Sequence, residues 1–270
     1  MALFNFWHKK KEESKEEELF PKIDLHAHIL PDVDDGSKDE AMTLEMMEAA
    51  LKAYVVHINA TAHHRNSLSP EVEVIGKAFA RTKEMRDKNL LPLSLSCSFE
   101  TEFYPEVERL FRDCRISLTG KGNKYALIEF TADVNSQSAL AAVFQLSLSG
   151  FRPVIVHPER FYFVQRHPEV AGEMQSRGAL IMPNATSFMG HYGMTAMDTA
   201  EKIVQSGFAD ALASDAHRPD YYEQYLLGCK YVAKKFGNSL LYELTWKTPC
   251  KILGYEPESE HDDFDPFTEK

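Results

Sequence analysis

The sequence lacks several features that would each assign the protein to a broad class. No apolar run approaches the ~20 residues that a membrane-spanning helix needs, and no secretory apolar segment is present. Cationic residues are scarce, since 30 Lys and Arg face 41 Asp and Glu and leave a net charge of -11. Because phosphate backbones are held mainly by clustered cations, this acidity argues against nucleic-acid binding.

Cysteine is also rare. The four cysteines lie far apart and form no C-x-x-C pair, which favours a reducing cytoplasm. None of them has an arginine six residues later, as the phosphate loop of a cysteine-dependent phosphatase requires. No G-x-x-x-x-G-K-[ST] motif occurs either, so a P-loop NTPase is excluded.

Charge and periodicity divide the 270 residues into a central domain and two tails. Residues 1–20 and 256–270 are predicted as charged tails, and residues 21–255 as one domain. Within that domain, short β-rich runs lie at 23–27, 55–60, 92–99, 125–130, 153–156, 179–182 and 211–213. Segments with helical spacing lie between them, at 38–53, 70–88, 136–149, 167–177, 194–206 and 219–236. This alternation predicts an α/β fold with a parallel sheet, arranged as a TIM-like (β/α)7 barrel. The second run is the weakest strand, because His57 and Asn59 are unusual in a buried parallel strand.

Histidines and carboxylates follow six of the seven predicted strands. These side chains are His26, His28, Asp34, Asp35, His63, His64, Glu100, Glu102, Glu129, His157, Asp215 and His217. In a barrel the loops after the strands converge on one face, which carries the active site. Any one of these residues alone is more often a hydrogen-bonded core residue than a ligand. It is improbable, however, that the whole set has only a structural role.

The chemistry of this set points to metal ions. Glu129 ends an apolar run, Y-A-L-I-E-F, and a buried carboxylate must be paired, metal-bound or neutralised. Lysine is absent from these strand ends, so divalent cations are the economical counter-charge. Imidazole and carboxylate ligands without thiolate suit manganese, iron or zinc. Such ions would also attract an anionic substrate that the acidic pocket would otherwise repel.

The order of motifs resembles that of a known superfamily. The motifs are H-x-H, an Asp nine residues after the first His, T-x-H, E-x-Y, Y-A-L-I-E-F, P-V-I-x-H-x-E-R and S-D-x-H. Over residues 22–255 they resemble the polymerase and histidinol phosphatase (PHP) superfamily. Within it, the chain is most similar to bacterial protein-tyrosine phosphatases of capsule and exopolysaccharide synthesis. The resemblance implies a distorted (β/α)7 barrel with three divalent metal ions, manganese first and iron or zinc as alternatives.

The resemblance also implies three groups of metal ligands. The first is His26, His28, Glu102 and Asp215; the second shares Glu102 and adds Glu129 and His157; the third is Asp35, His63 and His217. Spacing alone leaves Asp34, His64 and Glu100 open as alternatives to Asp35, His63 and Glu102, and only the family pattern selects among them.

The implied reaction is hydrolysis of protein phosphotyrosine by a hydroxide held in the trinuclear site. Arg160 and Arg218 follow predicted ligands and are expected to grip the phosphate as catalytic residues. Arg65 and Tyr104 are candidates for substrate binding, although a solvated arginine and a packed tyrosine are the plainer interpretations. The implied partner is an autophosphorylating bacterial tyrosine kinase of capsule or exopolysaccharide export, recognised through its tyrosine-rich tail.

Three alternatives stay open at this point. Histidinol-phosphate hydrolases and other small phosphoesterases of the PHP superfamily share most of the ligands. Amidohydrolases also begin with H-x-H and end with a barrel Asp, but they do not need the third ligand group. A metal-stabilised scaffold would bind phosphotyrosine without releasing phosphate.

Overall fold

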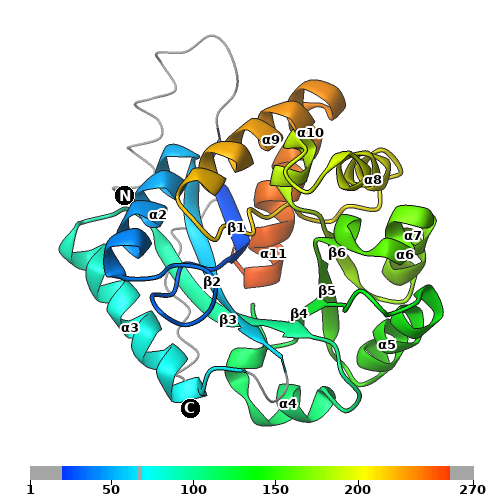
Figure 1. Cartoon of the computed structure of the whole chain (residues 1–270), viewed down its shortest axis with the longest axis horizontal. Helices are drawn as coiled ribbons and strands as arrows, with labels where there is room; N and C mark the ends of the chain where they lie inside the picture. The colour runs from blue at the N-terminus through cyan, green and yellow to red at the C-terminus, as the bar shows by residue number, and fades with distance from the viewer. Residues whose placement is uncertain (1–19, 66–68, 256–270) are drawn as a thin grey trace.

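The architecture is a curled parallel sheet surrounded by helices (Figure 1). A computed structural model of the chain describes residues 20–65 and 69–255, so the charged tails lie almost wholly outside the described residues. Six strands are hydrogen-bonded in sequence order, and every neighbouring pair is parallel. They are β1 (Lys22–Ala27), β2 (Val55–His64), β3 (Ser94–Glu102), β4 (Tyr125–Glu129), β5 (Arg152–Val156) and β6 (Leu180–Met182). The predicted parallel sheet and its first six strands are therefore present.

The seventh predicted strand, at residues 211–213, is replaced by two isolated parallel bridges. Ala213 pairs with Asn184 just after β6, and Ala216 pairs with Ala27 at the end of β1. The segment thus lies between the two edges of the sheet without forming a continuous ladder. Part of the reason is that the amide of Leu212 donates to the carbonyl of Leu244, far along the chain, and is not available to a neighbouring strand.

Helices connect the strands, as the periodicity predicts. The six predicted helices correspond to α2 (Glu40–Lys52), α3 (Val72–Lys88), α5 (Ser136–Leu148), α7 (Glu169–Ser176), α8 (Met194–Gln205) and α9 (Asp220–Phe236). Short helices that the sequence analysis did not predict are α4 (Glu108–Asp113), α6 (Tyr162–Arg166), α10 (Asn238–Tyr242) and α11 (Thr248–Leu253). A π-helical turn, η5 (Glu243–Lys247), joins α10 to α11, and 3-10 turns occupy η2 (Arg115–Ser117), η3 (Pro158–Arg160) and η4 (Ala185–Met189). Within residues 20–65 and 69–255, no helix combines the length and the apolar character that crossing a membrane demands.

Strand β2 is buried despite its polar residues, because those residues bond to one another inside the sheet. His57 Nε2 lies 2.9 Å from Ser96 Oγ on β3. The amide of Asn59 donates to the Leu25 carbonyl and to Ser98 Oγ, and Asn59 Oδ1 accepts from Ser96 Oγ. Buried polar groups are tolerated when they are hydrogen-bonded, so the doubt about this strand was misplaced.

The curled sheet has apolar clusters on both of its sides. The outer clusters pack helices such as α2, α3, α5 and α9 against the strands. A separate inner cluster joins Leu25 of β1, Leu127 of β4 and Val156 of β5 to Trp246 and Ile252 near the end of the chain. Helix α11 accordingly lies within the ring of strands, beside β1 (Figure 1). The interior is closed by this segment at one end, which leaves the carboxyl ends of the strands to form the site.

Candidate metal centre

Eight of the nine predicted metal ligands gather at the carboxyl ends of the strands, together with Glu100. Their side-chain nitrogens and oxygens form overlapping groups whose atoms lie within 4.8 Å of one another. The groups are His28, Asp35, His63 and His217; His26, Glu100 and His157; His26, His28 and Asp215; and His63, Glu100 and Glu129. The structure therefore brings the predicted residues together, among those it describes, with Glu100 in the place expected for Glu102.

The carboxylate of Glu100 lies at the centre of this cluster. Its Oε2 is 3.3 Å from His26 Nε2, 3.2 Å from His28 Nε2 and 2.8 Å from His63 Nδ1. Its Oε1 is 2.8 Å from His157 Nε2. The side chain is fully buried, and one carboxylate thus faces four imidazoles. This is the position that a carboxylate shared between metal ions would occupy.

Glu102, which the resemblance selected for that shared role, lies at the rim. It points to the same side of β3 as Glu100, because side chains two residues apart share a face of a strand. It is the last residue of the strand, its side chain is 32% exposed, and its Oε2 lies 4.0 Å from Arg65 Nε. No group of converging ligand atoms among the described residues includes it. The geometry favours Glu100, the alternative that spacing had left open.

The third predicted group is brought together as expected. Asp35 Oδ1 lies 3.1 Å from His63 Nε2 and 3.4 Å from His217 Nε2. His64, the alternative to His63, turns away and packs its ring 4.9 Å from that of Phe99. Asp35 and His63 are therefore the members of each pair that lie in the cluster.

Asp34, the alternative to Asp35, orients ligands instead of joining them. Its Oδ2 lies 2.8 Å from His28 Nδ1 and accepts from the amide of His63 at 3.2 Å. Its Oδ1 accepts from the amide of Gly36. Carboxylate partners of this kind fix the orientation and tautomer of metal-binding histidines.

The tautomers that these partners impose show that the site fits cations. A carboxylate or carbonyl only accepts, so His28 donates from Nδ1 to Asp34, and His217 donates from Nδ1 to the carbonyl of Asp215 at 2.9 Å. In the neutral form that binds a metal ion, each imidazole would then present the lone pair of Nε2 to the cluster. There His28 Nε2 faces Glu100, and His217 Nε2 faces Asp35. Lone pairs that face carboxylate oxygens repel each other unless a cation lies between them.

The carboxylates and imidazoles of the cluster shift one another's pKa values. Burial would raise the pKa of Glu100, but the charge on His26 and hydrogen bonds from the surrounding imidazoles lower it well below its usual range. Burial also opposes the charged form of His28, yet Asp34 and Glu100 raise its pKa well above the ordinary value. The carboxylates and the imidazoles therefore stabilise one another's charges, and divalent cations bound among them would take the place of the protons that do so.

The backbone is strained at two candidate ligands. His157, directly after β5, has φ 35°, and Asp215 has φ 52°, so both lie in the left-handed region that non-glycine residues rarely adopt. Hydrogen bonds hold them there, from the amide of His157 to the Met182 carbonyl and from the amide of Asp215 to the His26 carbonyl. Such strain concentrates at functional sites, where it points side chains in directions that a regular strand does not allow.

The two oxygens of Asp215 face different surroundings. Oδ1 lies 3.5 Å from His26 Nε2 and 3.6 Å from His28 Nε2. Oδ2 accepts from Asn184 Nδ2 at 2.8 Å, Arg160 Nη1 at 3.0 Å and the Tyr192 hydroxyl at 3.2 Å. One oxygen is thereby saturated with donors, and the other is left to the imidazoles.

The arginines predicted to grip phosphate lie around the cluster at different depths. Arg160 is 36% exposed, and its guanidinium lies 4.6 Å from the centre of the Tyr192 ring. Arg218 is 58% exposed and pairs with Asp220, beside the rim. Arg65 Nε lies 4.0 Å from Glu102 Oε2 at the rim. Within the part of the chain that the structure describes, Arg160 is the one of these three that contacts a member of the cluster.

Tyr104 lies beside the alternative histidine, with its ring centre 6.2 Å from that of His64. Burial raises the pKa of its phenol. Its ring also packs against the apolar cluster that contains Phe111 and Phe130, a position compatible with both packing and substrate binding.

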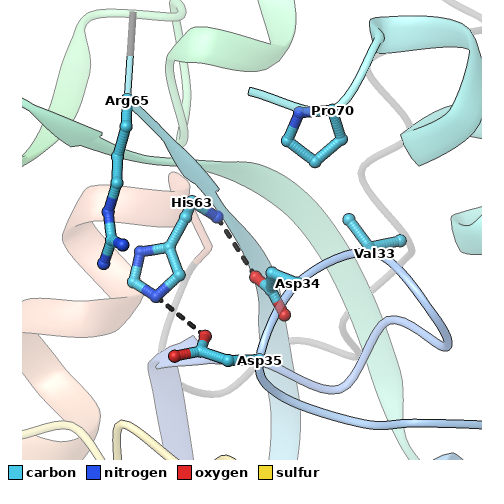
Figure 2. Close-up of a pocket in the computed structure, with 6 residues that line it drawn as sticks. All are labelled: Val33, Asp34, Asp35, His63, Arg65 and Pro70. Atoms are coloured by element: carbon cyan, nitrogen blue, oxygen red, sulfur yellow. Dashed lines mark hydrogen bonds and ion pairs between the residues drawn. The ribbon is translucent and has the colours of Figure 1, made fainter. Parts of the chain in front are cut away.

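A cleft of about 240 Å³ opens beside the third ligand group, as Figure 2 shows. In Figure 2 the His63 ring lies between Arg65 and Asp35, and Val33 and Pro70 stand on the other side. The lining is Val33, Asp34, Asp35, His63, Arg65 and Pro70. Two apolar side chains and a cation beside candidate metal ligands are suited to a substrate with an anionic group and an apolar body.

Sequence reasoning missed several residues that support the ligands. Asp24, Tyr192 and Glu159 were not singled out. Glu159 is buried and accepts from the amide of Asn184 and from the hydroxyl of Ser187. A polar residue two positions from a strand-end histidine was the available signal for Asp24 and Glu159. Tyr192 had no comparable signal, because its contacts at the site, with Arg160 and Asp215, are distant in sequence.

The chain was compared with protein families, curated proteins and solved structures. The family model described as "Capsular polysaccharide synthesis, CpsB/CapC" matches residues 22–254. The tyrosine-protein phosphatase YwqE of Bacillus subtilis is 32% identical over 225 residues, covering 83% of this chain and 88% of YwqE. The tyrosine-protein phosphatase CpsB of Streptococcus pneumoniae is 26% identical, covering 86% of this chain and 98% of CpsB.

Solved structures agree with the sequence matches. A structure described under "YwqE from Bacillus subtilis and CpsB from Streptococcus pneumoniae, unique metal-dependent tyrosine phosphatases" superposes with a TM-score of 0.77 at 30% identity. The match covers 87% of this chain and 95% of that one. An organophosphorus hydrolase from Deinococcus radiodurans superposes with a TM-score of 0.56 at 12% identity, over 86% of this chain and 93% of that one, and shows only a shared TIM-like fold. The protein therefore belongs to the CpsB/CapC family of capsular polysaccharide synthesis.

Proposed function

We propose that this protein is a metal-dependent tyrosine phosphatase that hydrolyses phosphotyrosine in a protein substrate. The observation that carries the proposal is the single cluster in which Glu100 faces four imidazoles while Asp35 and Asp215 flank it. The 32% identity to the tyrosine-protein phosphatase YwqE supports the choice of substrate. We take residues 21–255 as the catalytic unit and residues 211–217 as the segment that fills the position of the seventh barrel strand.

The donor set suits three divalent ions, with manganese first and iron or zinc as alternatives. We assign the first ion to His26, His28, Glu100 and Asp215, the second to Glu100, Glu129 and His157, and the third to Asp35, His63 and His217. Glu100 takes the shared position in place of Glu102. When bound, the ions would act as Lewis acids on the phosphoryl group and lower the pKa of water.

The residues of the chain supply position and charge around that chemistry. Arg160 lies at the edge of the cluster, where its guanidinium can hold two oxygens of a phosphoryl group, and Arg218 can approach from the rim. The apolar cleft side chains Val33 and Pro70 offer a surface to the phenyl ring, with Arg65 at the far wall and Tyr104 as a further candidate contact. A phenolate leaving group, pKa about 10, is easier to expel than an alkoxide, which reduces the need for a general acid.

The discriminating experiment compares phosphotyrosine peptide with histidinol phosphate as substrates of the purified protein plus manganese. We expect phosphate release from the peptide and at least about tenfold lower kcat/KM on histidinol phosphate, because the cleft favours an aryl body. His157→Ala should remove most activity while circular dichroism stays unchanged. Preference for histidinol phosphate would overturn the substrate assignment, and peptide binding without phosphate release would identify a scaffold.

We further infer that the physiological substrate is the tyrosine-rich tail of a bacterial kinase of capsule or exopolysaccharide export, met in the cytoplasm. None of the four cysteines, all of which lie within the described residues, forms a disulfide, in keeping with a reducing compartment. Incubation with the autophosphorylated kinase should remove its phosphotyrosine signal on an immunoblot, and a signal that persists would exclude that partner.

A further inference from the structure

Tyr192 occupies a short turn between η4 and α8 that is fixed on two sides. The amide of Gly193 donates to the carbonyl of Gly190, so His191 and Tyr192 are the central residues of a four-residue turn. Both glycines have positive φ, 73° at Gly190 and 88° at Gly193. The turn therefore holds its two central side chains in directions that the flanking helices could not provide.

The neighbouring histidine anchors the turn to helix α9. His191 Nδ1 lies 2.8 Å from Gln224 Oε1, and His191 Nε2 lies 3.1 Å from the hydroxyl of Tyr221. The rings of His191 and Tyr221 are also in edge contact, with centres 4.8 Å apart. Because both imidazole nitrogens are engaged, the turn is held in place from outside, and Tyr192 points inward from a fixed base.

Tyr192 makes two separate contacts at the metal centre. Its ring face lies 4.6 Å from the guanidinium carbon of Arg160, and its hydroxyl donates to Asp215 Oδ2 at 3.2 Å. A guanidinium that lies over an aromatic ring is attracted to the ring face, which restricts the rotation of the arginine side chain. This attraction strengthens when water is excluded. Half-burial of Tyr192 and near-complete burial of Asp215 provide that exclusion.

The three donors on Asp215 Oδ2 have different fates when an anion arrives. Asn184 and Tyr192 are neutral and have no reason to leave, whereas Arg160 is cationic and would be drawn to a phosphoryl group. If Arg160 turns toward phosphate, the other two donors keep Oδ2 satisfied. Asp215 Oδ1 can then stay directed at His26 and His28 throughout.

We propose that Tyr192 is a positioning residue whose main role is to hold the Arg160 guanidinium beside the phosphoryl site, while its hydroxyl shares with Asn184 the task of keeping Asp215 oriented. The role rests on the proposed phosphatase function for its kinetic consequences, but the contact with Arg160 can be tested without catalysis. Tyr192 touches neither substrate nor metal in this role; it acts through Arg160 and Asp215.

A double-mutant cycle between Tyr192 and Arg160 tests the kinetic part. With phosphotyrosine peptide and manganese, Tyr192→Leu should lower kcat by about tenfold or more, because misplacing a phosphate-binding group is costly. In an Arg160→Ala background the same substitution should lower kcat by less than about twofold. Tyr192→Phe keeps the ring and should recover most of the activity that Tyr192→Leu loses. Equal losses in both backgrounds, or a phenylalanine variant as poor as the leucine variant, would overturn the proposal.

Two control variants separate this role from general effects. Tyr162 stacks on Arg166 at 4.3 Å, outside the metal centre, so Tyr162→Leu deletes a comparable pair and should leave kcat unchanged. Tyr231→Phe removes a hydroxyl that bonds to Glu201 and should also leave kcat unchanged. A loss of kcat in either control equal to that of Tyr192→Leu would show that the effect is not specific to Arg160.

The side chain of Arg160 provides a readout that does not depend on turnover. In protein prepared with chelator, the 15N signal of Arg160 Nε should show restricted motion in the wild type and in Tyr192→Phe. It should show fast motion in Tyr192→Leu. Unchanged Arg160 dynamics in Tyr192→Leu would overturn the positioning role, even if the wild-type protein hydrolysed no phosphotyrosine. Absence of hydrolysis with the expected dynamics would instead overturn only the proposed function.

Discussion

The carboxylate of Asp24 accepts hydrogen bonds from both the backbone amide and the hydroxyl of Ser214, a residue 190 positions later in the chain. Asp24 lies on β1 two residues before His26, and Ser214 immediately precedes Asp215. These bonds therefore tie together the two chain segments that carry His26 and Asp215. The Asp24 side chain is fully buried, so the pairing is protected from water.

Replacing Asp24 should loosen the metal centre as well as the fold. In Asp24→Asn only the side-chain oxygen can accept, so the amide and the hydroxyl of Ser214 can no longer each bond to a separate oxygen of this side chain. We expect a loss of about 1–3 kcal/mol in the free energy of unfolding and about ten- to hundredfold weaker manganese binding. Urea unfolding and calorimetric titration measure these quantities. Ser214→Ala removes only the hydroxyl bond and should have a smaller effect on both; manganese binding unchanged in Asp24→Asn would contradict the role.

Glu100 and Glu102 form a matched pair for testing the shared carboxylate. Glu100→Gln removes the charge that faces four imidazoles and should abolish manganese binding at the shared position, with phosphatase activity falling by at least about 100-fold. Glu102→Gln alters a rim side chain near Arg65 and should change kcat by less than about threefold, as expected for an exposed ion pair. If Glu102→Gln lowered activity more than Glu100→Gln, Glu102 would be the shared carboxylate and our assignment of Glu100 would be wrong.

Gly36 should tolerate no side chain, for a reason that concerns His28. A Cβ at this position would lie 2.2 Å from the His28 carbonyl oxygen and 2.4 Å from the His28 Cβ. Gly36→Ala must therefore displace the backbone that carries a candidate ligand. We expect at least about tenfold weaker manganese binding together with reduced thermal stability. Electron paramagnetic resonance of free manganese gives the affinity, and a wild-type value would show that the turn relaxes without moving His28.

Removing metal should destabilise the protein. The lone pairs of His28 and His217 and the carboxylates of Glu100 and Asp35 converge, and without cations they depend on protons to offset their repulsion. A ligand that binds only the folded state stabilises it by mass action, about 2.7 kcal/mol at 100 times its Kd. Excess chelator should therefore lower the melting temperature and abolish phosphate release, and added manganese should restore both. If calorimetry gave the same melting temperature in manganese as in chelator, the result would argue against metal ions bound to the native fold.

The thiol of Cys250 should make stability depend on alkaline pH. Burial raises its pKa to about 12, whereas an unfolded cysteine titrates near 8.5. Below pH 8.5 both states keep the proton; above it the unfolded chain loses the proton first, so the free energy of unfolding falls as pH rises. The stability advantage of the wild type over Cys250→Ala should shrink by about 1–2 kcal/mol between pH 8 and pH 10. Urea unfolding at the two pH values checks this, and a constant difference would mean that the thiol ionises freely in the fold.

The sequence by itself determined the alternation of strands and helices and the positions of the ligands at strand ends. Both follow from local rules: apolar runs of strand length, helical spacing between them, and polar residues where a buried run stops. It also determined the exclusion of a cysteine nucleophile, since that chemistry requires a fixed local spacing. Local rules or the motif order predicted eight residues that the structure brings together as candidate ligands: His26, His28, Asp35, His63, Glu129, His157, Asp215 and His217.

Only the tertiary structure decided which of two neighbouring carboxylates enters the cluster and what holds the ligands there. Glu100 and Glu102 share a face of β3, and the difference between them is depth along the strand, which no sequence spacing encodes. The bond from Asp24 to Ser214 and the contact of Tyr192 with Arg160 join residues far apart in the chain. The seventh predicted strand, at residues 211–213, is likewise replaced by two isolated bridges, because its backbone bonds to a distant segment at Leu244. Local patterns specify what each segment can offer, and packing between distant segments determines which offered groups meet.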